Sequence, residues 1–398
     1  MLVVGAGPAG LSCALALRAR GIDVTVLDER AAGGLRPGSR AIYTHRASLR
    51  LFEEMRPGLG FDLARRGIVW STNRTLWRGR EVYARSFRPR PDDVLPPFTS
   101  LPQTEVERCL VEACEGAGVE LIWNARAQTV AAHADAVQVT TSAGRTWVAS
   151  WVVGADGARS TVRRAIGTAM QGSRSENAYV IVDLGEIPDE QRPAERIFHY
   201  EHPAAGGRNV LVVPFRGGWR VDLQCRADDD VERFDRDDGL RSWVADVMGA
   251  QYAQRIEWAS TYRFLQVVAG RLTDDSHRVL LIGEAAHLFA PFGARGMNSA
   301  IADAHAAALA IHEASEDPDV ARAAIERFAH DRRAAALVNR RAAGQALQAI
   351  QGRHPWSRSK RRLAVALAPR VERAARWLDS APYGPRLRQT RRSQGSGY

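Results

Sequence analysis

Three apolar runs that end at glycine turns dominate the hydrophobic pattern of the chain. Residues 2–4, 151–153 and 278–282 are almost wholly apolar, and a glycine follows each run within a residue. Each turn then leads into a stretch with helical spacing, so each segment predicts a buried strand, a tight loop and a helix. The first turns of such helices carry unpaired N–H groups, which suit an anion or an electron-rich ring.

The first of these segments has the spacing of a dinucleotide-binding loop. Residues 5–10 read Gly-Ala-Gly-Pro-Ala-Gly, a helical pattern covers 11–20, and a second strand over 23–27 ends at Asp28. In this context the first glycine forms the turn, the second admits a pyrophosphate, and the third allows close packing of helix on strand. The alternative is a glycine-rich turn in an ordinary parallel sheet. Either Asp28 or Glu29 meets the ribose, because adjacent strand residues face opposite ways, and we favour Asp28. The candidate cofactor residues of this segment are Gly5, Gly7, Pro8, Ala9, Gly10, Asp28, Glu29 and Arg30.

The second and third segments repeat the arrangement. Asp156 lies in a Gly-Ala-Asp-Gly turn, where it either accepts from ligand hydroxyls or caps the next helix. The third segment runs through a loop into an alanine-rich helical pattern over 299–314. Its candidate residues are Gly283, Glu284, Pro291, Gly293, Gly296, Met297 and Asn298.

The pattern of apolar and polar residues changes to short alternating runs between residues 176 and 265. Alternating runs over 208–215 and 219–225 flank Gly217 and Gly218, which predicts a hairpin in an antiparallel sheet. We therefore expect an α/β fold with a discontinuous nucleotide domain, an inserted antiparallel-sheet domain and C-terminal helices. The predicted nucleotide-binding domain comprises 1–70, 101–175 and 272–345. The sheet domain comprises 71–100 and 176–271, and helices and a basic tail form 346–398.

Composition narrows the class of protein. The formal net charge is +10, concentrated in residues 353–392, and we expect a solvated basic helical face there rather than a nucleic-acid site. No apolar run is long enough to span a bilayer and no leader precedes the first strand, so a cytoplasmic protein without membrane partners is expected. The four cysteines show no disulfide or metal spacing and are expected to be reduced.

Together these motifs resemble the single-component flavoprotein aromatic hydroxylases of the p-hydroxybenzoate hydroxylase-like family, over about residues 1–390. The resemblance implies a Rossmann-like FAD-binding domain of the GR2 type. It places the FAD pyrophosphate at residues 5–10, FAD and NAD(P)H at 154–163, and the ribityl chain and isoalloxazine at 283–298. Residues 39–42 resemble the loop whose arginine, here Arg40, touches the flavin side of the cofactor. Residues 101–106 resemble the segment whose glutamine, here Gln103, meets the ribityl chain.

The motifs of residues 39–42 and 291–296 are most similar to the branch that acts on phenolic acids and polyketide-like phenols in secondary metabolism. Two features depart from the pattern of that branch. The late motif usually reads Gly-Asp, and here it reads Gly283-Glu284, which moves a carboxylate by about one C–C bond relative to tight hydrogen-bond distances. A C-terminal thioredoxin-like domain is expected to be absent. Met1 lies four residues before Gly5, so the first strand is expected to be short and the start truncated.

The family resemblance implies the chemistry as well. NAD(P)H reduces the flavin, O₂ forms a flavin C4a-hydroperoxide, and the distal oxygen attacks an aromatic, phenolic substrate. The sequence shows no nucleophile-and-base or metal-ligand cluster, in agreement with chemistry carried by a cofactor. The helix that starts near Asn298 is expected to stabilise negative charge at the flavin N1–C2=O edge. The expected partners are a small aromatic substrate and O₂, with the chain a monomer or a homodimer.

A base near the pocket would activate a phenol, and the candidates have ordinary structural alternatives. A surface position is the alternative for His45, a packed core position for Tyr262, and a salt bridge on the sheet face for Arg220. His199 and Tyr200 alternate on one strand, where one is expected to be packed and the other wet. Arg40, Arg220 and Arg295 are candidates for attracting a substrate carboxylate. The alternatives on the same fold are an epoxidase, a Baeyer–Villiger enzyme, a reductase, or a flavin-binding protein that has lost its catalytic activity.

Overall fold

A five-stranded parallel sheet forms the centre of the nucleotide-binding part of the chain. The computed structural model describes residues 1–34, 42–87, 93–175, 177–190, 192–352 and 355–384. The strand order is β19-β11-β1-β2-β7. The bounds are β1 Leu2–Val4, β2 Thr25–Leu27, β7 Glu120–Ile122, β11 Val152–Gly154 and β19 Val279–Leu281. The central strands β1 and β11 and the edge strand β19 are buried along their whole length, as expected of a parallel sheet covered on both faces.

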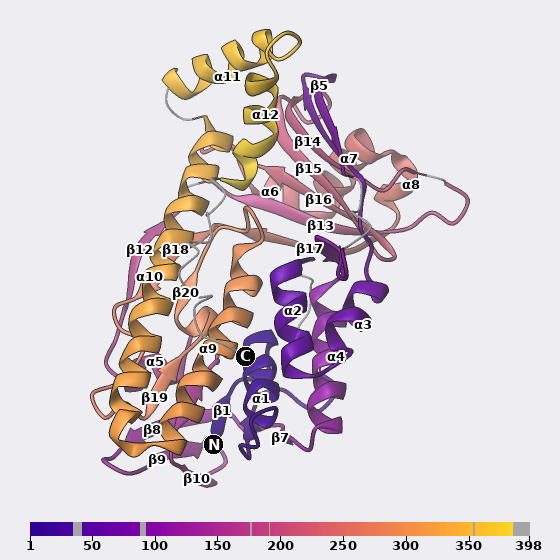
Figure 1. The fold of residues 1–398 in the computed structure, drawn as a ribbon. Coiled ribbons are helices and arrows are strands. Elements are labelled where there is room, and N and C mark those ends of the chain that lie inside the picture. Colours follow the sequence, from indigo (N-terminus) through magenta and orange to yellow (C-terminus); the bar gives the residue numbers. More distant parts are fainter. Residues whose placement is uncertain (35–41, 88–92, 176, 191, 353–354, 385–398) are drawn as a thin grey trace.

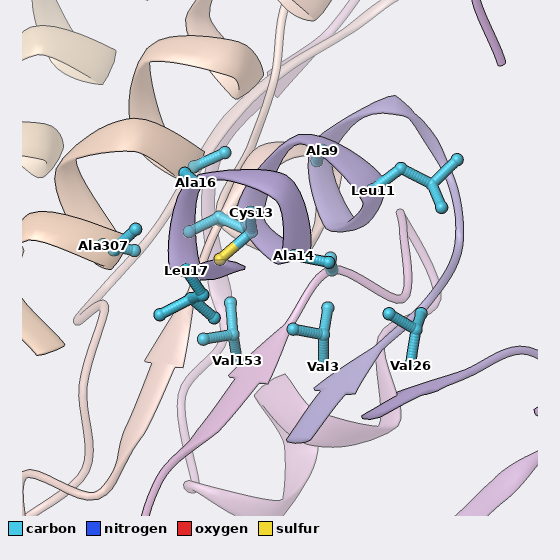
Figure 2. Packing of buried hydrophobic residues seen from close by; sticks show 14 of the residues in the cluster. Val3, Ala9, Leu11, Cys13, Ala14, Ala16, Leu17, Val26, Val153 and Ala307 are labelled. Carbon is cyan, nitrogen blue, oxygen red and sulfur yellow. The ribbon is translucent and has the colours of Figure 1, made fainter. Parts of the chain in front are cut away.

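Two alanine-rich helices pack together on this sheet. Helix α1 (Pro8–Arg18) contacts both the sheet and helix α9 (Arg295–Glu316). Figure 2 shows the α1 side chains above Val3, Val26 and Val153 of the sheet, with Ala307 of α9 beside them. Small side chains let the two helices approach closely, which brings the starts of both helices to the same side of the molecule.

Smaller elements complete this part of the fold. Helix α4 (Gln103–Gly116) packs against α1, and α2 (Arg46–Met55) packs against both α1 and α9. Further helices are α3 (Leu59–Arg66) and α5 (Thr161–Ala165). One antiparallel sheet contains β8 (Ala127–Ala132), β9 (Val137–Thr141) and β10 (Thr146–Ala149). A second contains β12 (Met170–Arg174), β18 (Leu265–Ala269) and β20 (His287–Leu288), and β3 (Tyr43–His45) pairs with β6 (Phe98–Ser100).

The predicted antiparallel sheet has seven strands in the order β17-β13-β16-β15-β14-β4-β5. Their bounds are β4 Thr72–Trp77, β5 Arg80–Ser86, β13 Tyr179–Gly185, β14 Glu195–His202, β15 Arg208–Phe215, β16 Gly218–Gln224 and β17 Ile256–Tyr262. The predicted hairpin is confirmed as β15–β16, and β4 joins β14 by a parallel pair. One face packs against α7 (Asp237–Met248) and α8 (Ala250–Ala253), with α6 (Glu232–Asp235) beside α7.

A long helix connects the two parts. Helix α10 (Pro318–Gln351) runs beside α9 and β18 toward the end of the molecule that carries α12 (Figure 1). The predicted boundary at residues 345 and 346 lies inside this continuous helix. The chain then forms α11 (Pro355–Leu367), α12 (Glu372–Ser380) and the 3₁₀ turn η2 (Ala381–Tyr383).

The basic run on α11 is only partly the solvated face that the charge pattern predicts. Arg358, Lys360 and Arg362 are exposed, but Arg361 is buried over the ring of Tyr200 at 5.3 Å. Burial lowers the pKa of Arg361. All four cysteines are buried thiols. Within the described ranges, no helix combines the length and the apolar character needed to cross a bilayer.

The third glycine segment differs from its prediction at one point. Helix α9 begins at Arg295, four residues before the predicted start, so Gly296, Met297 and Asn298 form its first turn. Ala294 precedes the helix with φ +52° and sets its starting direction. The glycine in the first turn had suggested a loop, but a helix tolerates glycine where the turn packs against little else.

Candidate functional site

The first glycine loop is packed tightly at two of its glycines and is open at the third. A Cβ on Gly5 would lie 2.4 Å from the carbonyl oxygen of Ala155, and one on Gly10 would lie 1.8 Å from the Gly5 oxygen. Gly7 has no atom within 4 Å of its Cβ position, and it precedes α1 without a side-chain cap. The first turn of α1 therefore opens onto unfilled space, with N–H groups available to an anion.

The carboxylate at the end of β2 lies against this loop. Asp28 Oδ2 accepts from the Ala6 N–H at 2.5 Å, while Oδ1 accepts from the backbone N and Nε of Arg30, both at 2.9 Å. Burial alone would raise the pKa of Asp28, but the Arg30 contacts and the Ala6 N–H hold it below its ordinary value. Glu29 points away, and its exposed carboxylate lies 3.6 Å from Arg126. The structure therefore leaves an ionised Asp28 at the loop.

A polar network connects helix α4 to the same loop. Arg30 donates to the Ala6 carbonyl at 2.7 Å and to Glu107 Oε2 at 3.1 Å. Gln103 Nε2 donates to the other oxygen of Glu107 at 2.8 Å. Sequence reasoning missed Glu107, although a carboxylate four residues after Gln103 falls on the same helix face.

The second segment uses its carboxylate internally. Asp156 accepts from the Ser160 hydroxyl and from the backbone N–H groups of Thr161 and Val162, at 2.7 and 3.1 Å. Burial raises the pKa of Asp156 despite these bonds. The helix-capping alternative therefore describes the contacts of Asp156 in this structure. Nearby, the buried Arg163 donates to the carbonyl of Ala285 at 3.1 Å and so joins the second segment to the third.

A buried ionic cluster fixes the start of the third segment. Asp303 of α9 accepts from the Gly283 N–H at 3.2 Å, from Arg332 Nε at 2.7 Å, and lies 2.6 Å from His287 Nε2. Burial alone would raise the pKa of Asp303, but His287 and Arg332 lower it to about 2. Glu284, next to this cluster, is exposed.

The first turn of α9 is open in the same way as that of α1. Its N-cap residue Ala294 makes no side-chain capping hydrogen bond, and no described atom beyond the local backbone lies within 4 Å of a Cβ position at Gly296. The Asn298 side chain donates to the Tyr43 carbonyl at 2.9 Å and accepts from the His45 backbone N–H at 2.9 Å. Asn298 thus ties α9 to β3. Around it Met297 is buried, Gly293 is half-buried and Pro291 is exposed. Arg40 lies outside the described residues.

Two of the candidate bases are His45 and Tyr262. His45 lies beside the α9 start, with Nε2 3.2 Å from the Gly293 carbonyl, and its pKa is lowered chiefly by burial. Tyr262 is half-buried on β17, its ring 6.4 Å from that of Trp258.

His199, Tyr200 and Arg220 each make a contact within the sheet domain or with the C-terminal helices. His199 Nε2 accepts from the Gly79 N–H at 2.8 Å, and burial lowers its pKa to about 4, so the ring is neutral. The Tyr200 hydroxyl donates to the Leu378 carbonyl at 2.9 Å. Both are buried, so the expected alternation of packed and wet positions is wrong. Arg220 makes a buried two-point salt bridge to Asp183, with both contacts at 2.8 Å.

A small cavity lies between the seven-stranded sheet and the loop that precedes α9. Its lining includes Tyr179, Phe198, Asp222, Phe264 and Phe292. Sequence reasoning missed Asp222, whose only signal was its alternation with Arg220 and Gln224 on one strand. A larger open hollow between β12, β18 and α10 shares no residue with the glycine segments.

Two helix starts without side-chain caps thus lie at the first and third glycine segments, and a small cavity on the antiparallel sheet includes Pro291 and Phe292 of the loop before α9 in its lining. Residues 1–341 match the family model described as an FAD binding domain, and the chain belongs to this family. The resemblance expected from the motifs is confirmed at that level.

Individual known proteins agree. The chain is 31% identical over 322 residues to 6-methylpretetramide 4-monooxygenase from Streptomyces rimosus, covering 77% of this chain and 54% of that protein. It is 28% identical to rifampicin monooxygenase from Rhodococcus hoagii, covering 76% of this chain and 62% of that protein. The chain therefore spans only about half to two thirds of the length of these relatives.

The fold is also that of a solved structure, p-nitrophenol 4-monooxygenase PnpA from Pseudomonas putida DLL-E4. The TM-score is 0.78 at 24% identity, and the superposition covers 97% of this chain and 98% of that one. The predicted fold class is confirmed. FAD fits the residues present, because the positions left open at Gly7 and Gly296 adjoin two uncapped helix starts.

Proposed function

We propose that the protein is an FAD-dependent monooxygenase that uses NAD(P)H and O₂ to hydroxylate a phenolic aromatic substrate. The observation that carries this proposal is the pair of helix starts at Gly7 and Ala294, which lack a side-chain cap and where no described atom beyond the local backbone lies within 4 Å of a Cβ position at Gly7 or Gly296. Family membership and the names of the relatives support the same reaction class. The dependence on NAD(P)H favours a cytoplasmic location, and the relatives favour a polyketide-like phenol from secondary metabolism.

The chain would hold the adenosine half of FAD at the first segment. The start of α1 offers N–H groups to the pyrophosphate, and the open space at Gly7 admits it. Asp28 is ionised, and among the described residues its Oδ2 accepts one hydrogen bond, from Ala6, which leaves acceptor capacity for a ribose hydroxyl. Arg30 holds this carboxylate in place through two contacts.

The chain would hold the flavin half at the third segment. Gln103 and Glu284 are the proposed ribityl contacts, and the first turn of α9 would hold the flavin ring. Positive partial charge at the start of this 22-residue helix would stabilise negative charge on a ring bound there. Asn298 keeps that helix start against β3, so the electrostatic contribution is preorganised rather than assembled during reaction.

When bound, FAD supplies hydride acceptance from NAD(P)H and the activation of O₂. The chain contributes position and the exclusion of water. The aromatic side chains Tyr179, Phe264 and Phe292 form an apolar wall between the sheet and the α9 loop. Such a wall packs against an aromatic ring and keeps bulk water from the reacting carbon.

The test is to purify the protein and follow its flavin. We expect FAD absorption in the purified protein, NADPH or NADH oxidation that a matching phenol accelerates, and one labelled oxygen in the product from ¹⁸O₂. Separate NADH and NADPH titrations identify the preferred coenzyme. Coenzyme oxidation with a reduced, unlabelled product would instead indicate a reductase. A protein that binds FAD but is never reduced under any of these conditions would contradict the proposed activity.

A further inference from the structure

The inner face of the seven-stranded sheet carries a row of polar side chains on strand β16. Arg220, Asp222 and Gln224 alternate on this strand, and Asp222 stands opposite Ile181 of β13 and Leu211 of β15. The opposite face of the sheet is apolar and packs against α7 and α8. The polar row is therefore turned toward the cavity and the loop that precedes α9.

The two neighbours of Asp222 in this row already have partners. Arg220 binds both oxygens of Asp183 at 2.8 Å, and Gln224 Oε1 accepts from Asn209 Nδ2 at 2.8 Å. Asp222 Oδ1 is buried, and within the described part of the chain it has no hydrogen-bond partner. A buried carboxylate oxygen without a donor costs free energy, which indicates a donor supplied from outside the chain.

The surroundings of this oxygen indicate the chemical class of that donor. Aromatic rings from Tyr179, Phe198, Phe264 and Phe292 line the same cavity as Asp222. Phe292 lies two residues before Ala294, the N-cap of α9 and the proposed flavin contact, so the cavity adjoins the reacting end of the site. The cavity measures about 20 Å³, room for roughly one water molecule. A substrate ring therefore enters only as the aromatic lining moves apart.

We propose that Asp222 binds the hydroxyl group of the phenolic substrate and accepts its proton. This inference rests on the proposed function and names the group that recognises the substrate. The substrate O–H bond breaks, a new O–H bond forms on Asp222 Oδ1, and the electron pair stays on the substrate oxygen. The ring becomes a phenolate, whose added electron density favours attack by electrophilic oxygen.

Electrostatics around Asp222 agree with this role. Burial raises the pKa of Asp222 to about 7, with Arg220 opposing the rise and Asp183 adding to it. Tyr179 on β13 is the other titratable group in the cavity lining, and the lining from β14, β15, the α9 loop and α10 carries no charge. A base with a pKa near neutral pH is suited to general base catalysis.

The experiment compares a phenol with its methyl ether, here 2-naphthol and 2-methoxynaphthalene, binding to the FAD-loaded protein at pH 8. An ionised carboxylate accepts from the hydroxyl and finds no donor on the ether, so we expect about tenfold or greater preference for 2-naphthol. In Asp222→Asn the preference should fall to about twofold, whereas Asp222→Glu should retain part of it. Lowering the pH from 8 to 6 should reduce the preference in the wild-type protein and leave Asp222→Asn unchanged.

Controls separate recognition from folding. Asp228→Asn makes the same chemical change at an exposed position and should keep the wild-type preference. Thermal unfolding and FAD content of each variant show that it is folded and loaded. A purely structural effect of the substitution would lower the affinity for both probes by the same factor and would leave the ratio of the two affinities unchanged.

Three results would overturn the assignment of Asp222: equal affinity of the wild-type protein for both probes, no binding of 2-naphthol, or full preference in Asp222→Asn. Failure of this assignment is distinguishable from failure of the proposed function, because flavin content and NAD(P)H reduction are read on the same samples. A protein that binds FAD and is reduced by NAD(P)H, but does not prefer 2-naphthol, would contradict only the role of Asp222. A protein that never retains FAD defeats the proposed function itself.

Discussion

Asp28 is buried and Asp156 is half-buried, each near the end of a parallel strand, yet the contacts of the two carboxylates differ. Both carboxylate oxygens of Asp156 accept hydrogen bonds from its own loop and from the first turn of α5. Asp28 reaches across to Ala6 and keeps the first glycine loop beside it. The difference arises from the following residues, because a serine and an open helix start lie within reach of Asp156, whereas Arg30 follows Asp28.

Glu284 offers a prediction at the same scale. Its carboxylate is exposed next to the fixed Gly283, and it extends about one C–C bond further than the aspartate usual at this position. We expect Glu284→Asp to bind FAD about tenfold more tightly, because the shorter side chain restores near-ideal distances to a ribityl hydroxyl. The measurement is the dissociation constant of FAD from the refolded apoprotein. Glu284→Gln, which keeps the length and removes the charge, is the control. Weaker binding in Glu284→Asp would contradict the prediction.

At the scale of elements, α9 is positioned by one buried carboxylate. Asp303 joins the α9 interior to the Gly283 turn, to His287 of β20 and to Arg332 of α10. Helix α9 therefore meets three other segments at one charge that has little exposure to water. Loss of the charge leaves buried donors without an acceptor, so the position of the α9 start depends on it.

We expect Asp303→Asn to lower the free energy of unfolding by about 3 kcal/mol at pH 7. The pKa of Asp303 is about 2 in the folded protein against an ordinary 3.8, so its stabilisation is complete above about pH 4. That contribution is lost as the pH falls from about 4 to 2, so the variant and the wild-type protein should converge there. Urea unfolding at pH 7 and pH 3 measures both effects. Asp331→Asn, at an exposed position of α10, is the matched control.

The glycine loop before α1 gives a second prediction about elements. Gly7 has an extended backbone with φ −79° and free space around its Cβ position, so Gly7→Ala should fold with unchanged stability. The added methyl group occupies the space proposed for the pyrophosphate, so FAD affinity should fall about tenfold or more. Gly10→Ala should instead destabilise the apoprotein, because its Cβ would overlap the Gly5 oxygen. Thermal unfolding without FAD and FAD titration separate the two effects. Equal FAD affinity in Gly7→Ala would contradict the assignment.

At the scale of the whole molecule, the site is assembled from segments that are distant in the sequence. The parallel sheet places residues 2–4, 152–154 and 279–281 side by side, and α10 carries the chain from this sheet toward α12 (Figure 1). The cavity beside the site is lined by four strands of the seven-stranded sheet, by Phe264, by the α9 loop and by α10. A ligand bound here therefore contacts both halves of the fold.

Binding of FAD should stabilise the molecule as a unit. At a free concentration one hundred times its dissociation constant, FAD should add about 2.7 kcal/mol to the free energy of unfolding. The apparent melting temperature of the apoprotein should therefore rise with FAD concentration in a single transition. FMN lacks the adenosine half that Asp28 and the α1 start would hold, and it should produce a smaller rise. Equal shifts by FMN and FAD would contradict the role of the first glycine loop.

The sequence by itself determined the strands, the glycine turns and the hairpin, because these depend on local periodicity and on residues that must pack closely. It also narrowed the ribose ligand to Asp28 or Glu29, since the strand ends there. The tertiary structure decided between the two local roles open for Asp156, which caps its own helix. Only the tertiary structure decided that His199 and Tyr200 are both buried, and that Asp222 Oδ1 has no hydrogen-bond partner among the described residues. The partners of His199 and Tyr200 lie more than a hundred residues away in the chain, and the local sequence pattern does not indicate which distant residues fold against them.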